Sequence, residues 1–310
     1  MIDQDGGIDD ALALILALRS SELEVAGITS VSGNVTVEQA TLNALRVVDL
    51  LNRGDVPVAM GLANPLVRDA VRATSFHGKD GLGDSNLPLS RIRPSDKSAL
   101  DAISDELATS KPHELTIICT GPLTNIAALL TSLPDAAKKI KELVIMGGVY
   151  GLTEYGVGNV TPVAEFNIYA DPEAAKIVFE SGISLEAVGL DVTMMPKNQL
   201  TLADYASIKR GKGRVAAFAA AILNKNIHHH GIFALHDPMT VATRVKPSLF
   251  QFADYKVHVE TRGEITAGMT VADRRERPPP GKMLGEKVLI CKNVDSRGFK
   301  NLFLDCLISA

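Results

Sequence analysis

Short apolar runs rich in β-branched residues alternate with stretches of helical periodicity, and this alternation restricts the possible folds more than any other feature of the chain. Strands that are apolar on both faces are typical of a parallel sheet covered by helices on both sides. We therefore expect an open, doubly wound α/β fold with a mostly parallel sheet and a Rossmann-like core. The expected strands are 23–31, 56–60, 115–119, 143–146, 185–190, 255–261, 269–273 and 287–291, and the expected helices are 36–52, one from about 123, 172–181 and a last one at the end of the chain.

The length of 310 residues allows one large α/β domain or two ordinary ones. We find no internal repeat and no low-complexity segment. The proline-rich stretch 278–281 is predicted to be a turn or loop and not a linker between domains. The chain is therefore expected to form a single domain over residues 1–310.

Composition argues against several classes of protein. The net charge of -4 gives no basic footprint for nucleic acid. The chain has no run of about 18 apolar residues, the length a membrane span needs, and no signal peptide, so a cytoplasmic location is expected. Three widely spaced cysteines in apolar surroundings indicate reduced core residues and not a disulfide framework or a zinc site.

Four carboxylates fall within eight residues near the start of the chain, and no lysine or arginine follows until Arg19. They are Asp3, Asp5, Asp9 and Asp10. Holding several close carboxylates ionised is costly, and a hard cation with oxygen ligands removes that cost. The apolar run 11–18 predicts a buried helix whose first turn carries Asp9 and Asp10, where the helix dipole favours negative charge. Either acid alone would be an ordinary helix-capping residue, but the cluster favours a metal or catalytic role.

The acidic segment is expected to follow the first strand. Only Met1 and Ile2 precede Asp3. That strand is therefore either very short or truncated.

Further candidate site residues stand where other predicted strands end. Asn34 follows the second strand, Thr120 the strand that ends at Cys119, and Met146 closes the next one. In doubly wound sheets, ligands bind beyond the carboxyl ends of the strands, so these residues are expected to converge on one crevice. Each one taken singly would be ordinary turn chemistry.

Two downstream segments offer groups for a polar ligand. Asn159, Glu165 and Asn167 lie within nine residues and suit sugar hydroxyls, although a solvated loop is the alternative. Asp237 precedes a proline and an apolar run, so it either caps a helix or supplies a distant carboxylate to the metal. In the second case His236 beside it would act as an acid.

These motifs together resemble the nucleoside hydrolase family, the calcium-dependent, inosine-uridine preferring nucleoside N-ribohydrolases. The resemblance runs from residue 3 to about residue 273. The matching motifs are Asp3-x-Asp5-x-x-x-Asp9-Asp10, Thr120 to Asn125, Met146-Gly147-Gly148, Glu165-Phe166-Asn167 followed by Asp171 to Ala174, and His236-Asp237-Pro238.

The resemblance implies a nucleoside hydrolase-like fold and hydrolysis of the N-glycosidic bond of ribonucleosides to ribose and free base. It implies a calcium-bound water and an oxocarbenium-like transition state. The implied Ca²⁺ ligands are Asp5, Asp10, the backbone carbonyl of Thr120, and Asp237. Asp5 would also be the general base and His236 the leaving-group acid, while Asp3 would support the turn. Ribose and base would be bound by Asp9, Asn34, His77, Met146, Asn159, Glu165 and Asn167.

The chain departs from the family pattern in places. Gln4 stands where common members carry Thr or Cys, and Gly6 stands where they carry Pro. We expect neither difference to abolish activity. The chain has no tryptophan, which argues against the purine-specific branch and for an inosine-uridine or pyrimidine preference. The histidines in 226–231 (His228, His229 and His230) are either an exposed polar loop or contact the base. The family also suggests a homodimer or homotetramer.

Two other functions remain open. A magnesium-dependent phosphohydrolase would use Asp3 as nucleophile and Asp5 as acid, but the Gly6-Gly7 pair and the second pair of acids suit it poorly. A nucleoside-binding protein without turnover is the other, and the presence of both Asp5 and His236 argues against it.

Overall fold

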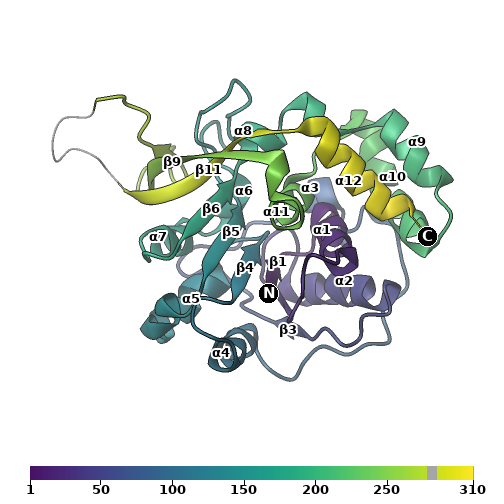
Figure 1. Ribbon diagram of the computed structural model, residues 1–310, viewed down its shortest axis with the longest axis horizontal. Coiled ribbons are helices and arrows are strands. Elements are labelled where there is room, and N and C mark those ends of the chain that lie inside the picture. The colour runs from purple at the N-terminus through teal and green to yellow at the C-terminus, as the bar shows by residue number, and fades with distance from the viewer. Residues whose placement is uncertain (278–284, 310) are drawn as a thin grey trace.

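A computed structural model describes residues 1–277 and 285–309 (Figure 1). The predicted turn at 278–281 lies outside the described residues. The strands are β1 (Ile2–Gln4), β2 (Ile28–Ser30), β3 (Val58–Met60), β4 (Thr116–Cys119), β5 (Glu142–Met146), β6 (Leu185–Val188), β7 (Leu200–Thr201), β8 (Ile232–Phe233), β9 (Phe250–Val259), β10 (Thr270–Ala272) and β11 (Glu286–Val294). The α-helices are α1 (Ile8–Arg19), α2 (Val37–Leu50), α3 (Thr74–His77), α4 (Ala99–Thr109), α5 (Thr124–Ser132), α6 (Phe166–Ala170), α7 (Pro172–Phe179), α8 (Leu190–Thr193), α9 (Leu202–Arg210), α10 (Arg214–His230), α11 (His236–Val245) and α12 (Ser296–Ile308).

Nine strands form one mostly parallel sheet in the order β10-β9-β11-β6-β5-β4-β1-β2-β3. Only the pairings of β9 with β10 and with β11 are antiparallel within it. A separate antiparallel pair joins β7 and β8. This arrangement confirms the predicted doubly wound α/β fold with a mostly parallel sheet.

Helices cover both faces of the sheet. Neighbouring side chains of a strand point to opposite sides, and both sets are apolar and need to be buried. In β5, Val144 belongs to the core shared with α1, α10, α11 and α12, whereas Leu143 and Ile145 belong to the core shared with α4, α5 and α7. All three side chains are fully buried. The strands are therefore apolar on both faces, as the sequence indicated.

The winding of the chain reverses between β1 and β4. From β1 the chain moves outward to β2 and β3, then returns to β4, on the other side of β1, and continues to β5 and β6. Such a reversal opens a crevice at the carboxyl ends of the two central strands. Asp5 follows β1 and Thr120 follows β4, so both lie at this crevice.

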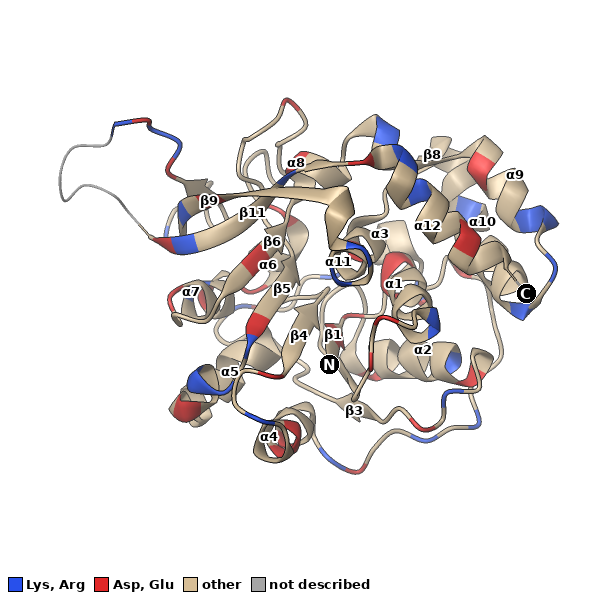
Figure 2. Cartoon of the chain, viewed as in Figure 1, with Lys and Arg blue, Asp and Glu red and all other residues tan. Residues whose placement is uncertain are grey.

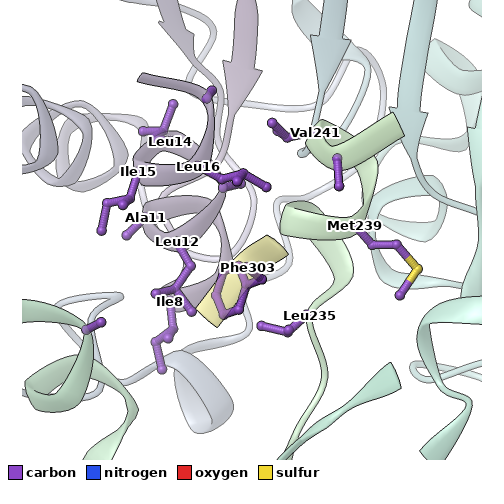
Figure 3. Packing of buried hydrophobic residues seen from close by; sticks show 14 of the residues in the cluster. Ile8, Ala11, Leu12, Leu14, Ile15, Leu16, Leu235, Met239, Val241 and Phe303 are labelled. Carbon is purple, nitrogen blue, oxygen red and sulfur yellow. The ribbon is translucent and has the colours of Figure 1, made fainter. Parts of the chain in front are cut away.

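The packing of α1 against α11 and α12 positions the acidic segment. Leu12 of α1, Leu235 just before α11 and Phe303 of α12 are buried in the same core (Figure 3). Because α1 and α11 pack against each other, their first turns meet at the crevice. The first turn of α1 carries Asp9 and Asp10, as predicted, and that of α11 carries Asp237.

Most element boundaries differ from the predicted ones by a few residues. The strand predicted at 23–31 is only β2, and the first strand is short and contains Asp3 instead of ending before it. Helices α4, α9 and α10 were not among the predicted elements. The segment 226–231, for which an exposed loop was one reading, forms the last turn of α10 and its Gly231 cap, where φ is +75°.

Acidic and basic residues are mixed on the outer helices, and both kinds occur on α9 and α12 (Figure 2). Among the described residues, no helix combines the length and apolar character that a bilayer crossing requires.

Candidate active site

A cavity of about 690 Å³ opens at the crevice between the strand ends. Its lining comes from loops that follow several strands, from α3, and from the start of α11. All the predicted site residues except Asp5 and Asp10 line it: Asp9, Asn34, His77, Thr120, Met146, Asn159, Glu165, Asn167, His236 and Asp237.

Three carboxylates meet beside the cavity. One oxygen each of Asp9, Asp10 and Asp237 lies within 4.8 Å of the others, and all three residues are buried. Each of these carboxylates stands in the first turn of a helix, where backbone N–H groups favour negative charge. In the part of the chain that the structure describes, no lysine or arginine lies within ion-pair distance of them.

Asp5 is fully buried next to this group and is held by Asn34. Its two oxygens accept hydrogen bonds from the backbone N–H and from Nδ2 of Asn34, each at 2.8 Å. A Cβ at Gly33 would lie 2.0 Å from Asp5 Oδ2, so only glycine permits this close approach. Each carboxylate oxygen has a second lone pair, so Asp5 can keep both hydrogen bonds and still bind a cation.

The side chain of Asp10 forms hydrogen bonds with the turn between β1 and α1 and with Thr120. Its Oδ2 accepts from the backbone N–H of Gly7 at 2.8 Å, and its Oδ1 accepts from the hydroxyl of Thr120 at 2.7 Å. These bonds join the end of β1 to the end of β4. Asp10 thus fixes the shape of the turn, while one of its oxygens belongs to the group of three acids.

Burial raises the pKa of all four carboxyls. It raises the pKa of Asp9 to about 8, with the nearby Asp10 adding to the effect, and it raises the pKa of Asp5, Asp10 and Asp237 as well. Asp9 Oδ1 is buried and accepts no hydrogen bond within the described residues. A bound divalent cation would supply the missing positive charge, so the donor set fits an oxygen-binding metal such as calcium.

Asp3 lies in β1 and does not line the cavity. Its Oδ1 accepts from Thr29 Oγ1 at 2.6 Å and from Asn125 Nδ2 at 2.8 Å. Burial raises its pKa to about 6. Asp3 therefore connects β1 to the neighbouring strand β2 and to helix α5.

Glu165 and Asn167 organise the opposite wall. Glu165 Oε2 accepts from the backbone N–H of Gly148 at 3.0 Å, and Oε1 accepts from that of Asn167 at 2.8 Å. Asn167 Nδ2 donates to the carbonyls of Thr120 and Met146, both at 3.0 Å. The Thr120 carbonyl, one of the predicted calcium ligands, thus already accepts one hydrogen bond and keeps one lone pair. Asn159 is exposed at the rim.

Two histidines face the cavity from different elements. The backbone N–H of Ile8 donates to Nδ1 of His77 at 3.1 Å, so the proton of that ring is on Nε2. Burial lowers the pKa of His77 to about 3. His236 is partly accessible, yet desolvation of its ring lowers its pKa to about 4. Its Nδ1 lies 2.8 Å from Thr193 Oγ1.

Sequence reasoning missed several residues of the apolar wall. Phe76 lines the cavity and stacks with both His230 and Phe233, with centroid distances of 5.8 Å and 5.9 Å. Of the three adjacent histidines, only His230 lines the cavity. The position of Phe76 beside the predicted His77 was the one available signal. Other lining residues that the sequence did not indicate include Arg72, Tyr169, Met194, Gln199 and Ile232.

The chain is similar to several known proteins over nearly its whole length. Residues 1–301 match the family model described as inosine-uridine preferring nucleoside hydrolase. The chain is 42% identical to the pyrimidine-specific ribonucleoside hydrolase RihA of Escherichia coli O81, over 99% of this chain and 97% of that protein. A plant nucleoside hydrolase, PpNRh1, superposes with a TM-score of 0.89 at 33% identity, covering 100% of this chain and 98% of the other. A purine-preferring ribonucleoside hydrolase from Gardnerella vaginalis gives 0.85 at 34% identity, covering 99% and 96%.

Proposed function

The chain belongs to the inosine-uridine preferring nucleoside hydrolase family and hydrolyses the N-glycosidic bond of ribonucleosides, and from this premise we propose that it does so with calcium at the acidic cluster. The observation that carries the proposal is the meeting of Asp9, Asp10 and Asp237 with one buried oxygen that lacks a donor among the described residues. Four buried carboxyls that form no ion pair with a lysine or arginine of the described residues suit a hard divalent cation.

The residues that would hold Ca²⁺ are Asp5, Asp10, the carbonyl of Thr120, and Asp237. When bound, the ion supplies positive charge that lowers the pKa of water and fixes its position. Asp9 belongs to the same group of acids, so its carboxylate adds negative charge beside the proposed ion. In this proposal Asp9 is not a calcium ligand and accepts a hydrogen bond from a ribose hydroxyl.

The remaining roles in this proposal are those that the family resemblance implies, and all of their residues except Asp5 line the cavity. Asp5 takes a proton from the attacking water, while Asn34, Asn159, Glu165 and Asn167 hold ribose hydroxyls. Met146 packs against the sugar, and His77 lies near the base. Carboxylate and amide oxygens around the ribose stabilise the positive charge that develops as the glycosidic bond breaks. His236 gives a proton to the departing base.

We further propose a preference for pyrimidine ribonucleosides such as uridine and cytidine. The relatives called RihA are named as pyrimidine-specific, and the chain has no tryptophan. A homodimer or homotetramer in the cytoplasm is part of the same proposal, and light scattering after size-exclusion chromatography tests the assembly.

The decisive experiment is a panel of uridine, cytidine and inosine assayed for base release, with and without a chelator. We expect base release that stops with chelator and returns with calcium, with uridine and cytidine cleaved faster than inosine. A phosphomonoester serves as the control substrate. Phosphate release without base release would instead support the magnesium-dependent phosphohydrolase, and binding of nucleosides without any release would support a binding protein.

A further inference from the structure

Thr193 contacts the ring of His236 and is itself fully buried. Its Oγ1 lies 2.8 Å from Nδ1 of His236. Thr193 is the last residue of α8, and His236 is the first residue of α11, so two elements 43 positions apart meet at this hydrogen bond. Neither sequence motifs nor the roles proposed above include Thr193.

The helix that carries Thr193 is firmly held. Asp191, two residues earlier, accepts from the backbone N–H of Tyr150 at 2.8 Å, and its own carbonyl accepts from Thr153 Oγ1 at 2.7 Å. The backbone N–H of Thr193 donates to the carbonyl of Gly189 at 3.2 Å. The hydroxyl therefore presents a fixed partner to the imidazole.

The contact decides which ring nitrogen reaches the substrate. Since Nδ1 is occupied by a fully buried side chain, Nε2 is the nitrogen left to the accessible edge of the ring, and His236 lines the cavity. No protein partner of Nε2 is found among residues 1–277 and 285–309. A ring free to turn about its last torsion would spend part of its time with Nε2 directed elsewhere.

We propose that Thr193 is a positioning residue, which holds Nδ1 of His236 so that Nε2 faces the leaving base. The inference rests on the proposed role of His236 as leaving-group acid. In that step the Nε2–H bond breaks, its electron pair stays on Nε2, and an N–H bond forms on the base. A hydroxyl suits the task because its oxygen can accept the hydrogen bond of Nδ1–H, and Nδ1 keeps that hydrogen when Nε2 gives up its own.

The test compares Thr193→Val with Thr193→Ser on two substrates. Uridine needs a proton on its leaving group, whereas p-nitrophenyl riboside has a leaving group that departs without one. We expect Thr193→Val to lower kcat/KM for uridine by about tenfold, the upper range for one neutral hydrogen bond, and for the nitrophenyl substrate by less than about twofold. Thr193→Ser, which keeps the hydroxyl, should stay within about twofold of the wild type on both.

Thr240→Val is the matched control. Thr240 is also fully buried, and its hydroxyl donates to the backbone carbonyl of His236 at 3.3 Å without touching the ring. We expect this variant to leave the ratio of the two substrates unchanged. An equal loss on both substrates in Thr193→Val would show a general distortion and overturn the proposal, as would no loss on either.

A double-mutant cycle and a measurement without turnover separate this proposal from the function on which it rests. In a His236→Ala background, Thr193→Val should have almost no further effect on uridine cleavage. Nitrogen-15 NMR of the His236 ring should show an altered Nδ1 signal in Thr193→Val and a retained one in Thr193→Ser. If the wild type cleaves uridine and His236→Ala impairs it, but the Nδ1 signal ignores Thr193, only the positioning role fails.

Discussion

Asp9 and Asp5 lie close together but have different surroundings, which fits the different roles proposed for them. Asp9 belongs to the close group of three acids, while Asp5, the predicted base and calcium ligand, has both oxygens bonded to Asn34. The bonds to Asn34 do not prevent Asp5 from binding calcium, because each carboxylate oxygen has a second lone pair. Asn34, predicted to bind ribose, therefore also orients Asp5.

The substitution His236→Ala should affect substrates according to their leaving groups. Without the imidazole, uridine must leave without its proton donor, so we expect a loss of about 10² to 10⁴ in kcat. p-Nitrophenyl riboside should lose less than about tenfold, because nitrophenolate is stable as an anion. Steady-state kinetics on both substrates checks this. Equal losses would remove His236 from the acid role.

At the scale of elements, the site depends on helices α1 and α11, whose first turns both lie at the crevice. The first turns of α1 and α11 carry Asp9, Asp10 and Asp237, and the buried contacts between the two helices fix how far apart these acids lie. Helix α8 adds a third support, since Asp191 holds the loop after β5 and Thr193 contacts His236.

Helix α2 connects the acidic turn to the loop that follows His77. Asn43 is buried, and its Nδ2 donates to the carbonyls of Gly6 and Asp80, both at 2.8 Å. Asn43→Ala removes both bonds and should lower the free energy of unfolding by about 2 kcal/mol. We also expect faster hydrogen exchange in the loop 78–84.

Thr41→Val controls for the loss of a buried polar side chain on the same helix. Its hydroxyl donates only to the carbonyl of Val37, one turn earlier. Urea unfolding and hydrogen exchange should show a smaller loss of stability and an unchanged loop in this variant. If both variants loosen the loop equally, Asn43 does not join it to the acidic turn.

The elements that could be predicted were those with local signals. The acids in the first turn of α1 and the long apolar run behind them were sufficient to place that helix, and strong strand patterns located β4, β5 and β6 to within a few residues. Helices α4, α9 and α10 were missed. The partners of Asn43, Thr193 and Asp191 could not be predicted, because each contacts a segment far away in the sequence and only the folded chain brings them together.

For the molecule as a whole, one core joins the two ends of the described chain. Ile2, Leu12 and Phe303 belong to the same buried cluster, and Arg19 Nη2 donates to the carbonyl of Ser309 at 2.9 Å. We therefore propose that residues 1–310 form a single domain. Scanning calorimetry should show one unfolding transition whose calorimetric and van't Hoff enthalpies agree. Two separable transitions would contradict it.

The three cysteines should be unreactive in the folded protein. Cys119 and Cys291 are buried and Cys306 is partly so. Burial raises the pKa of Cys291 to about 12 and that of Cys306 to about 11, and raises that of Cys119 as well. At pH 8 only about one thiol in 10³ or fewer is then ionised. An aromatic disulfide reagent should react slowly until denaturant is added, and then with all three. Rapid reaction of the native protein would contradict this.

Calcium should stabilise the entire fold, because its proposed ligands come from segments that are far apart in the sequence. Asp10 lies in α1 and Asp237 in α11, and an ion that binds both opposes their separation on unfolding. At about 100 times its Kd, a ligand contributes about 2.7 kcal/mol, which corresponds to about 5 °C in Tm for a chain of this size. Asp10→Asn should lose this increase, whereas Asp135→Asn, which changes an exposed carboxylate paired with Lys138, should keep it. Thermal unfolding with chelator and with calcium measures the difference, and an equal increase in both variants would remove Asp10 from the metal site.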